Sequence, residues 1–158
     1  MNSAVTVPQQ RPAAFWIYTG FILVEIVGFV GFFSPIVWVP TLAIFLVAGL
    51  WAYLERGRDS MLDTHYQFQI RTFWVNFVAG LALPLFFFVA VLGSVGSFLM
   101  WEDSPTSLVS LVLGVLAGTF LPILIGLGIS IWTIVRSLVG LNRLNDGKPI
   151  DNPTTWTI

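Results

Sequence analysis

The sequence predicts an all-α, polytopic membrane protein with four transmembrane helices. Of its 158 residues, 56% are hydrophobic and only 9% are charged, and the mean hydropathy is +0.87. Soluble domains carry about 25% charged residues. A charged fraction this low cannot cover a water-exposed surface, so we expect most of the surface to face lipid. Four apolar stretches, each long enough to cross a bilayer, complete this prediction.

The first two stretches predict a helical hairpin. A membrane helix needs about 20 apolar residues to cross a hydrocarbon core about 30 Å thick, and residues 14–33 and 36–53 fit this length. Ser34 and Pro35 separate them and favour a tight turn. Residues 1–13 form an N-terminal tail. No small-residue cleavage site follows a short apolar region, so we expect the first stretch to remain as an anchor.

The last two stretches, residues 72–99 and 108–135, are longer than one crossing requires. They contain Pro84 and Pro122. We expect these spans to tilt, to kink at the prolines, or to project beyond the bilayer. They complete a four-helix transmembrane domain over residues 14–135. A short amphipathic helix directly precedes span three. A second amphipathic segment and a tail, residues 136–158, follow span four.

The charges predict the orientation. With four spans, one side holds both termini and the loop between spans two and three, and all seven basic residues fall there. They are Arg11, Arg56, Arg58, Arg71, Arg136, Arg143 and Lys148. The loop between spans three and four carries only Glu102 and Asp103. The positive-inside rule therefore places both termini in the cytoplasm.

Most tryptophans lie at or near the ends of the predicted spans, where amphipathic rings settle at a membrane interface. These are Trp16, Trp38, Trp51, Trp74, Trp101 and Trp132.

The segment before span three carries a line of polar residues that continues into the span. On a helix, His65, Gln69, Thr72 and Asn76 recur every three or four residues. An apolar stripe of Leu62, Tyr66, Ile70, Phe73 and Phe77 lies beside it, and so does a polar stripe of Asp59, Asp63, Gln67 and Arg71. We therefore expect an interfacial amphipathic helix that runs into span three without a break.

Two interpretations of this polar line remain open. Its side chains form hydrogen bonds between helices, or they line a pore or substrate path. His65 is likewise a satisfied interfacial side chain or a proton switch.

Span four carries a face of small residues that predicts close helix packing. It consists of Gly114, Gly118, Pro122, Gly126, Ser130, Thr133, Ser137 and Gly140. Whether the partner helix belongs to the same chain is open at this stage. The sequence Asn145-Asp146-Gly147, with Pro149 beyond it, predicts the end of the helix. We expect an extended tail after it, with Trp156 free to dock.

Glu25 lies near the middle of span one. A carboxylate at the bilayer centre costs about 2.5–3.5 kcal/mol on insertion scales, so such residues usually face a bundle interior or a water-filled cavity. Burial without a partner favours its protonated form. It is either a hydrogen-bonded structural residue or a functional one.

Two segments, HYQFQIRTFW and RSLVGLNRLNDGKPIDNPTTW, resemble small bacterial inner-membrane proteins that are classed as domains of unknown function. That family is distantly similar to the twenty-kilodalton channel subunit of the Tic translocon of chloroplasts. The matching positions are His65, Phe68, Gln69, Arg71, Thr72, Phe73, Trp74, Arg136, Gly140, Leu141, Gly147, Pro149, Ile150, Pro153 and Trp156. The resemblance implies a four-helix membrane domain in a bacterial inner membrane.

The composition excludes several classes of function. No cysteine is present, which excludes disulfides, iron–sulfur clusters and thiolate zinc sites. A single histidine excludes a multi-histidine metal site within one chain. No basic cluster is dense enough for nucleic acid. The chain contains no phosphate-binding loop, His-Glu-x-x-His or Gly-x-Ser-x-Gly motif. We therefore expect no enzyme and no cofactor.

Two hypotheses of function follow. In the first, the protein is an accessory or assembly subunit that packs against another membrane protein through the small-residue face. In the second, it self-associates into a channel or translocation path that uses Glu25 and the line from Thr72 to Asn76. We prefer the first, because four short spans rarely enclose a pore alone.

Overall fold

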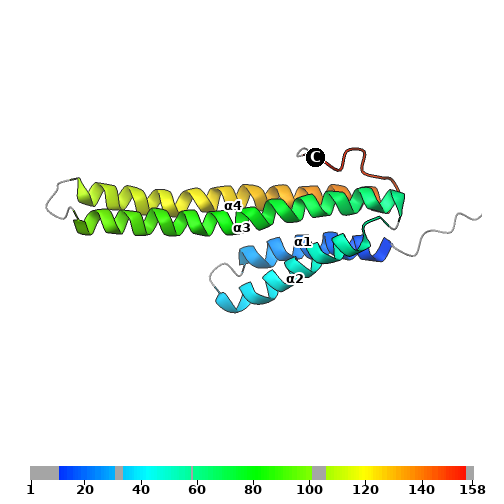
Figure 1. Ribbon diagram of the computed structural model, residues 1–158, viewed down its shortest axis with the longest axis horizontal. Helices are drawn as coiled ribbons and strands as arrows, with labels where there is room; N and C mark the ends of the chain where they lie inside the picture. The colour runs from blue at the N-terminus through cyan, green and yellow to red at the C-terminus, as the bar shows by residue number, and fades with distance from the viewer. Residues whose placement is uncertain (1–10, 31–33, 58, 101–105, 156–158) are drawn as a thin grey trace, which may run out of the picture. The chain divides into compact units, whose positions relative to one another are not determined.

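The computed structural model describes residues 11–30, 34–57, 59–100 and 106–155. Four helices account for nearly all of them, and these described residues contain no strand, which confirms the all-α prediction. The helices are α1 (Arg11–Val30), α2 (Pro35–Glu55), α3 (Ser60–Met100) and α4 (Ser107–Asn145) (Figure 1). Three of them, α2, α3 and α4, are long and apolar enough to cross a membrane. The apolar part of α1, Pro12–Gly28, is shorter.

The ends of α3 and α4 differ from the predicted span limits. The segment before span three and the span itself are one helix of 41 residues, and α4 likewise continues to Asn145 as one helix of 39 residues. At 1.5 Å per residue each is about 60 Å long, roughly twice the hydrocarbon thickness. Pro84 and Pro122 lie inside these helices, and neither ends its helix. The predicted amphipathic segments are thus the ends of long helices, and their place at a membrane surface stays a prediction.

The chain forms two compact units. Unit 1 comprises residues up to Trp74 together with the segment from Trp132 onward, and unit 2 comprises Val75–Ile131. Unit 1 therefore contains α1, α2, the first part of α3, the last part of α4 and the described tail.

The pairing of α1 with α2 in unit 1 confirms the predicted hairpin of the first two segments (Figure 1). A Cβ atom at Gly20 would lie 3.7 Å from Ala48, an ordinary van der Waals contact, so the two helices approach closely. On α1 the buried side chains are Ala14, Ile17, Tyr18 and Phe21, which recur with the period of a helix. Residues 31–33, which end the predicted first span, lie outside the described part of the chain.

Phe73 joins α2 to α3. Its ring stacks on Phe45 with centroids 4.8 Å apart. A Cβ atom at Gly49 would lie 2.3 Å from the Phe73 ring, so this contact requires glycine. The Trp74 indole nitrogen donates a hydrogen bond to the Tyr53 hydroxyl, 2.5 Å away, at the exposed edge of the same contact.

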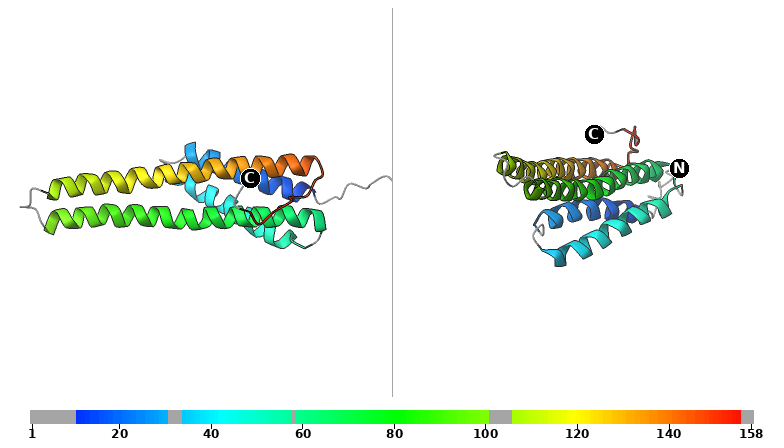
Figure 2. Two further views of the ribbon diagram at one scale, coloured as in Figure 1. Left: turned by 90° about the horizontal axis from the view of Figure 1, so that it is seen from above. Right: turned by 60° about the vertical axis from the view of Figure 1, so that its left-hand side comes forward.

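Unit 2 is a hairpin of two antiparallel helices in close contact (Figure 2). A Cβ atom at Gly114 would lie 1.6 Å from the Ser94 hydroxyl, and one at Gly118 would lie 2.8 Å from the Ala90 Cβ atom. At Gly126 the nearest atom belongs to Leu83, at 3.6 Å. The partner of this part of the small-residue face is therefore α3 of the same chain, which resolves the question that the sequence leaves open.

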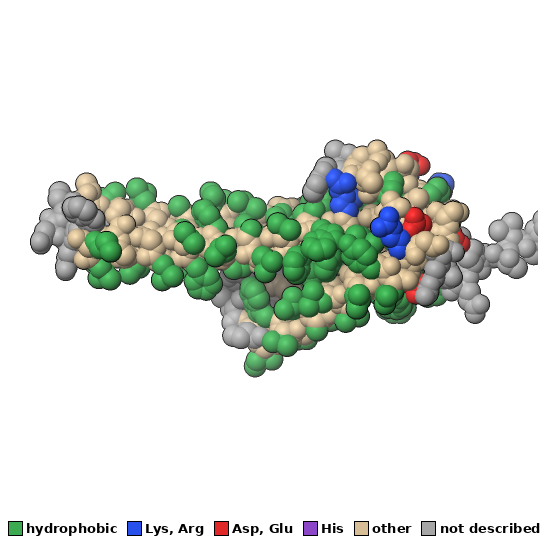
Figure 3. Space-filling view, viewed as in Figure 1, with side chains coloured by type: hydrophobic (Ala, Val, Ile, Leu, Met, Phe, Trp, Pro, Cys, Tyr) green, Lys and Arg blue, Asp and Glu red, His purple; other side chains and the backbone are tan. Residues whose placement is uncertain are grey.

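The outer surface of this hairpin is apolar. Figure 3 shows hydrophobic side chains along its visible face. Exposed members include Leu81, Leu85, Leu92, Leu116, Phe120 and Leu124. A surface of this kind is suited to lipid or to another apolar helix and not to water.

The end of α4 confirms the predicted helix stop. Gly147 has a φ of 68°, a left-handed conformation that glycine adopts without strain. The Lys148 amide donates to the Arg143 carbonyl (2.9 Å), and the Gly147 amide donates to the Leu144 carbonyl (3.1 Å). This pair of bonds is the Schellman motif. Trp156 lies outside the described residues, so its predicted docking stays a prediction.

Two glycines of α4 give the first testable prediction. Alanine is favoured over glycine in a helix by about 0.5–1 kcal/mol. Gly128 has open space around its Cβ position, whereas a Cβ atom at Gly118 meets Ala90. We expect Gly128→Ala to leave the thermal midpoint in nanodiscs unchanged or to raise it. Gly118→Ala should lower it, because the two helices must move apart. Equal midpoints for the two variants would contradict the packing of this hairpin.

Candidate functional site

Polar side chains from two helices are buried in the interior of unit 1. His65, Gln69, Thr72, Thr133, Arg136 and Ser137 each have 3% or less of their surface exposed, and Tyr18 of α1 is also buried. We call these seven residues the polar junction. They come from α1, the first part of α3 and the last part of α4, so segments far apart in the sequence meet here.

His65 connects α1 to the C-terminal tail. Its Nε2 lies 3.0 Å from the carbonyl oxygen of Lys148, and its Nδ1 lies 3.1 Å from the hydroxyl of Tyr18. Because a carbonyl only accepts, Nε2 carries the proton, and Nδ1 of the neutral ring accepts from the Tyr18 hydroxyl. Both ring nitrogens are therefore in use, and His65 acts as a connector between two elements.

Tyr18 also contacts α4. A Cβ atom at Gly140 would lie 2.4 Å from the Tyr18 ring, so only glycine permits this approach. The predicted small-residue face therefore has a second partner in this part of the chain, and that partner is α1.

Arg136 is the largest fully buried side chain of the molecule among the described residues. Its Cζ atom lies 3.5 Å above the centroid of the Phe68 ring and 5.1 Å from that of Trp132. Its Nε donates to the Thr72 hydroxyl at 3.0 Å, and this hydroxyl in turn donates to the Phe68 carbonyl at 2.9 Å. In place of water, the guanidinium contacts two aromatic faces and donates a hydrogen bond to a hydroxyl, and such contacts stabilise a buried cation.

Gln69 fastens α3 to α1. Its Nε2 donates to the Ala14 carbonyl at 2.9 Å. Its Oε1 is buried and has no hydrogen-bond partner among the described residues, and the same is true of the Ser137 hydroxyl.

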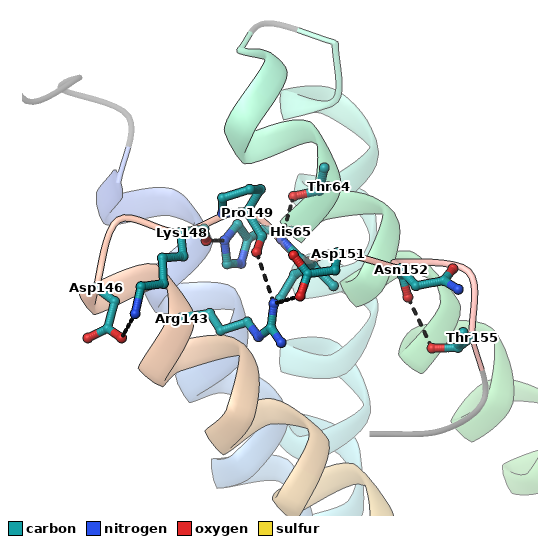
Figure 4. Close-up of polar contacts among 10 residues, drawn as sticks. Thr64, His65, Arg143, Asp146, Lys148, Pro149, Asp151, Asn152 and Thr155 are labelled. Carbon is teal, nitrogen blue, oxygen red and sulfur yellow. Dashed lines mark hydrogen bonds and ion pairs between the residues drawn. The ribbon is translucent and has the colours of Figure 1, made fainter.

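The C-terminal tail lies against the first turns of α3 (Figure 4). Thr64 Oγ1 accepts a hydrogen bond from the Ile150 amide at 3.0 Å, and the Ile150 side chain is buried. Arg71 donates to the Thr154 carbonyl. Arg143 of α4 donates to the Pro149 carbonyl at 3.3 Å and forms an ion pair with Asp151. The described parts of the two sequence segments that carry the family resemblance, residues 65–74 and 136–155, thus contact each other in unit 1.

The structure separates the predicted polar line into two parts. His65, Gln69 and Thr72 belong to the polar junction, whereas Asn76 lies in unit 2 and is half-buried. Arg71 is turned toward the tail. Glu25 is half-buried on α1 and takes part in a hydrogen bond or electrostatic interaction, so this residue is not isolated.

The predicted packing residues also divide between the units. Gly114, Gly118, Gly126 and Ser130 lie in unit 2. Thr133, Ser137 and Gly140 are buried in unit 1.

The sequence pattern did not reveal the roles of two residues, Tyr18 and Arg136. Tyr18 falls within an apolar stretch, and Arg136 is distinguished in the sequence as a basic residue that indicates orientation and as a position of the family resemblance. A signal existed for Arg136, because it directly precedes Ser137 and lies three residues after Thr133 on the small-residue face. For Tyr18 the signal was its spacing from Ala14 and Phe21, which places it on one helix face with them.

Comparisons of the chain with protein-family models, with curated proteins and with solved structures find no match. The family resemblance therefore stays an expectation. Within the described residues, no group of three or more histidine, cysteine, aspartate and glutamate side chains is arranged to hold a metal ion.

The shape of the guanidinium at position 136 gives the second prediction. Lysine keeps the charge but lacks the planar group that stacks on Phe68. We expect Arg136→Lys to lower the free energy of unfolding by about 1–3 kcal/mol. Thermal unfolding in mild detergent measures this. The matched control is Arg56→Lys, which alters an exposed contact of 3.8 Å with Asp63 and should change the free energy by less than about 0.5 kcal/mol. Similar losses for both variants would contradict this description of Arg136.

His65 gives the third prediction. It precedes the apolar stretch of α3, and burial lowers its pKa below the ordinary value of 6.5, with a smaller contribution from the charge of Arg143. The unfolded state therefore binds a proton more readily than the folded state. Stability should be full above pH 6.5 and should fall below it, by at most about 1.4 kcal/mol per pH unit. Unfolding of the wild type and of His65→Gln, compared at pH 7.5 and pH 5, tests this. A decline of equal size in the variant would contradict it.

Proposed function

We propose that this chain is a non-enzymatic integral membrane protein of the bacterial inner membrane and acts as an accessory or assembly subunit. In this proposal it packs against another membrane protein. The observation that carries the proposal is that side chains of the polar line form hydrogen bonds within the chain. His65, Gln69 and Thr72 make hydrogen bonds to Tyr18, Lys148, Ala14, Phe68 and Arg136 inside unit 1.

This arrangement favours a structural role for the polar line over a transport path. A path for ions or polar solutes needs side chains that face a water-filled space. Thr72 uses its hydroxyl both as donor and as acceptor, and both nitrogens of His65 are engaged. Groups that are used in this way hold helices together and are not available to a passing solute.

The apolar surface of unit 2 supports an interaction role. The glycines at positions 114 and 118 are used within the hairpin, so the surface that remains for a partner is the outward side of α3 and α4. Large apolar side chains such as Leu85, Leu92, Leu116 and Leu124 project from it. In lipid, a partner helix binds such a surface through close packing and not through a hydrophobic driving force.

The proposed topology has four membrane spans, with both termini in the cytoplasm. Its support is the distribution of the seven basic residues, all of which fall on one side of such a topology. The lengths of α2, α3 and α4 are consistent with it. The apolar part of α1 is shorter, and the proposal counts α1 as the fourth crossing. An even number of crossings is what places both termini on the same side.

A homo-oligomeric channel is the second candidate. The half-buried carboxylate of Glu25, on the same face of α1 as Tyr18 and Phe21, favours it. In that case Glu25→Gln should keep the fold and change the conductance of liposomes that contain the protein. A robust conductance that survives the change unaltered would remove Glu25 from the candidate path.

Site-specific photocrosslinking in native membranes tests the subunit role. A benzophenone side chain is introduced at Leu85, Leu92, Leu116 and Leu124, one position at a time. We expect adducts with a single second protein at some positions, because a partner covers one side of the hairpin and lipid covers the other. Native mass spectrometry of the mildly solubilised complex should give a fixed ratio of the two chains.

Phe73 is the matched control, because its ring is buried between Phe45 and Gly49. The same label there should crosslink only within the chain. Adducts solely between copies of this chain would favour the channel. Lipid adducts alone at all four outward positions would contradict the subunit role.

A further inference from the structure

Buried polar atoms of Gln69 and Ser137 in unit 1 are not accounted for by the contacts of the polar junction. They are the Oε1 atom of Gln69 and the hydroxyl of Ser137, which have no hydrogen-bond partner among the described residues. Gln69 is 0% exposed and Ser137 is 1% exposed. A buried polar atom without a hydrogen bond is costly, and native proteins satisfy nearly all such atoms, often with ordered water.

The two atoms belong to one layer of the junction. Along α3, Gln69 lies between His65 and Thr72, and along α4, Ser137 lies between Gly140 and Arg136. The same two contacts mark the ends of both intervals. At one end Tyr18 touches both His65 and Gly140, and at the other end Arg136 bonds to Thr72. Since α3 and α4 run antiparallel, Gln69 and Ser137 lie between the same two contacts.

The orientation of the Gln69 amide is also fixed. Its Nε2 donates to the Ala14 carbonyl, so Oε1 points in a different direction from this bond and presents an acceptor. The Ser137 hydroxyl can both donate and accept. An acceptor and a hydroxyl at the same level of two neighbouring helices match the partners of a water molecule, which donates two hydrogen bonds and accepts up to two.

We infer that unit 1 holds a structural water molecule that donates to Gln69 Oε1 and is hydrogen-bonded to the Ser137 hydroxyl. This water belongs to the polar junction at the layer of Gln69 and Ser137. It joins α3 to α4 there, as Thr72 joins them through Arg136 in the next layer. The inference rests on unit 1 alone and holds whether the protein is an accessory subunit or a channel.

The sign of one stability change tests this inference. If the Ser137 hydroxyl were simply buried and unpaired, Ser137→Ala would raise the thermal midpoint. If it binds water, the variant loses a bridge and leaves Gln69 unsatisfied, so the midpoint should fall by on the order of 3 °C or more. Ser110→Ala, at an exposed position of the same helix, serves as the control for the higher helix propensity of alanine.

A double-mutant cycle with Gln69→Met shows whether the two residues share the bridge. The losses from Ser137→Ala and Gln69→Met should not add, because either change removes the same water. Additive losses, or a higher midpoint for Ser137→Ala than for its control, would overturn the inference.

Nuclear magnetic resonance in nanodiscs distinguishes water from a direct bond between the two side chains. We expect a magnetisation-transfer signal between a long-lived water and the side-chain amide protons of Gln69, and we expect Ser137→Ala to abolish it. Coupling in the cycle without this signal would mean that Ser137 bonds directly to Gln69, and the inference would be wrong.

Discussion

A guanidinium that leaves water must find groups that replace its hydration, and Arg136 imposes this requirement on unit 1. It remains charged at any physiological pH. Phe68 and Trp132 provide ring faces, and Thr72 provides an oxygen. The contacts with Phe68 and Thr72 hold α4 in one register against α3. Once this register is set, Gly140 meets Tyr18, and Tyr18 in turn reaches His65. The position of α1 and of the tail therefore depends on where the cation is buried.

This dependence explains why a chain with so few polar residues places several of them in the same region. In a lipid environment, apolar contacts between helices give little specificity, because lipid tails solvate apolar side chains equally well. Hydrogen bonds and close contacts at glycine are directional. Unit 1 uses both: Gln69 to Ala14 and His65 to Lys148 are hydrogen bonds, and Gly49 against Phe73 is a close contact. Unit 2 uses mainly the second kind, at Gly114 and Gly118. The polar junction thus gives the helix contacts their specificity, and the outward apolar surface is what remains for lipid or for the proposed partner.

The helices could be predicted from the sequence, and the site only in part, for identifiable reasons. Long apolar runs define membrane helices with little ambiguity, and Gly147 with Pro149 marked the end of α4 correctly. Periodicity placed His65, Gln69 and Thr72 on one face, and the structure buries that face. Periodicity within one helix carries no information about the neighbour, so Tyr18 and the Lys148 carbonyl were not foreseen as the partners of His65. Arg136 was misjudged because a charge count treats every arginine at a span end as solvated.

The central claim is that His65, Gln69 and Thr72 of the polar line face the protein interior and not a water-filled path. The natural chain has no cysteine, so single cysteines can be placed without background. The most direct measurement is the labelling rate of Thr72→Cys and Ser137→Cys, two nearly isosteric changes, with a charged thiol reagent in native membranes. We predict that neither reacts, while Ser60→Cys at the exposed start of α3 reacts fully. A single bound water admits no such reagent. Rapid labelling at position 72 would mean that the line is open to solvent, and the structural role argued for it would be wrong.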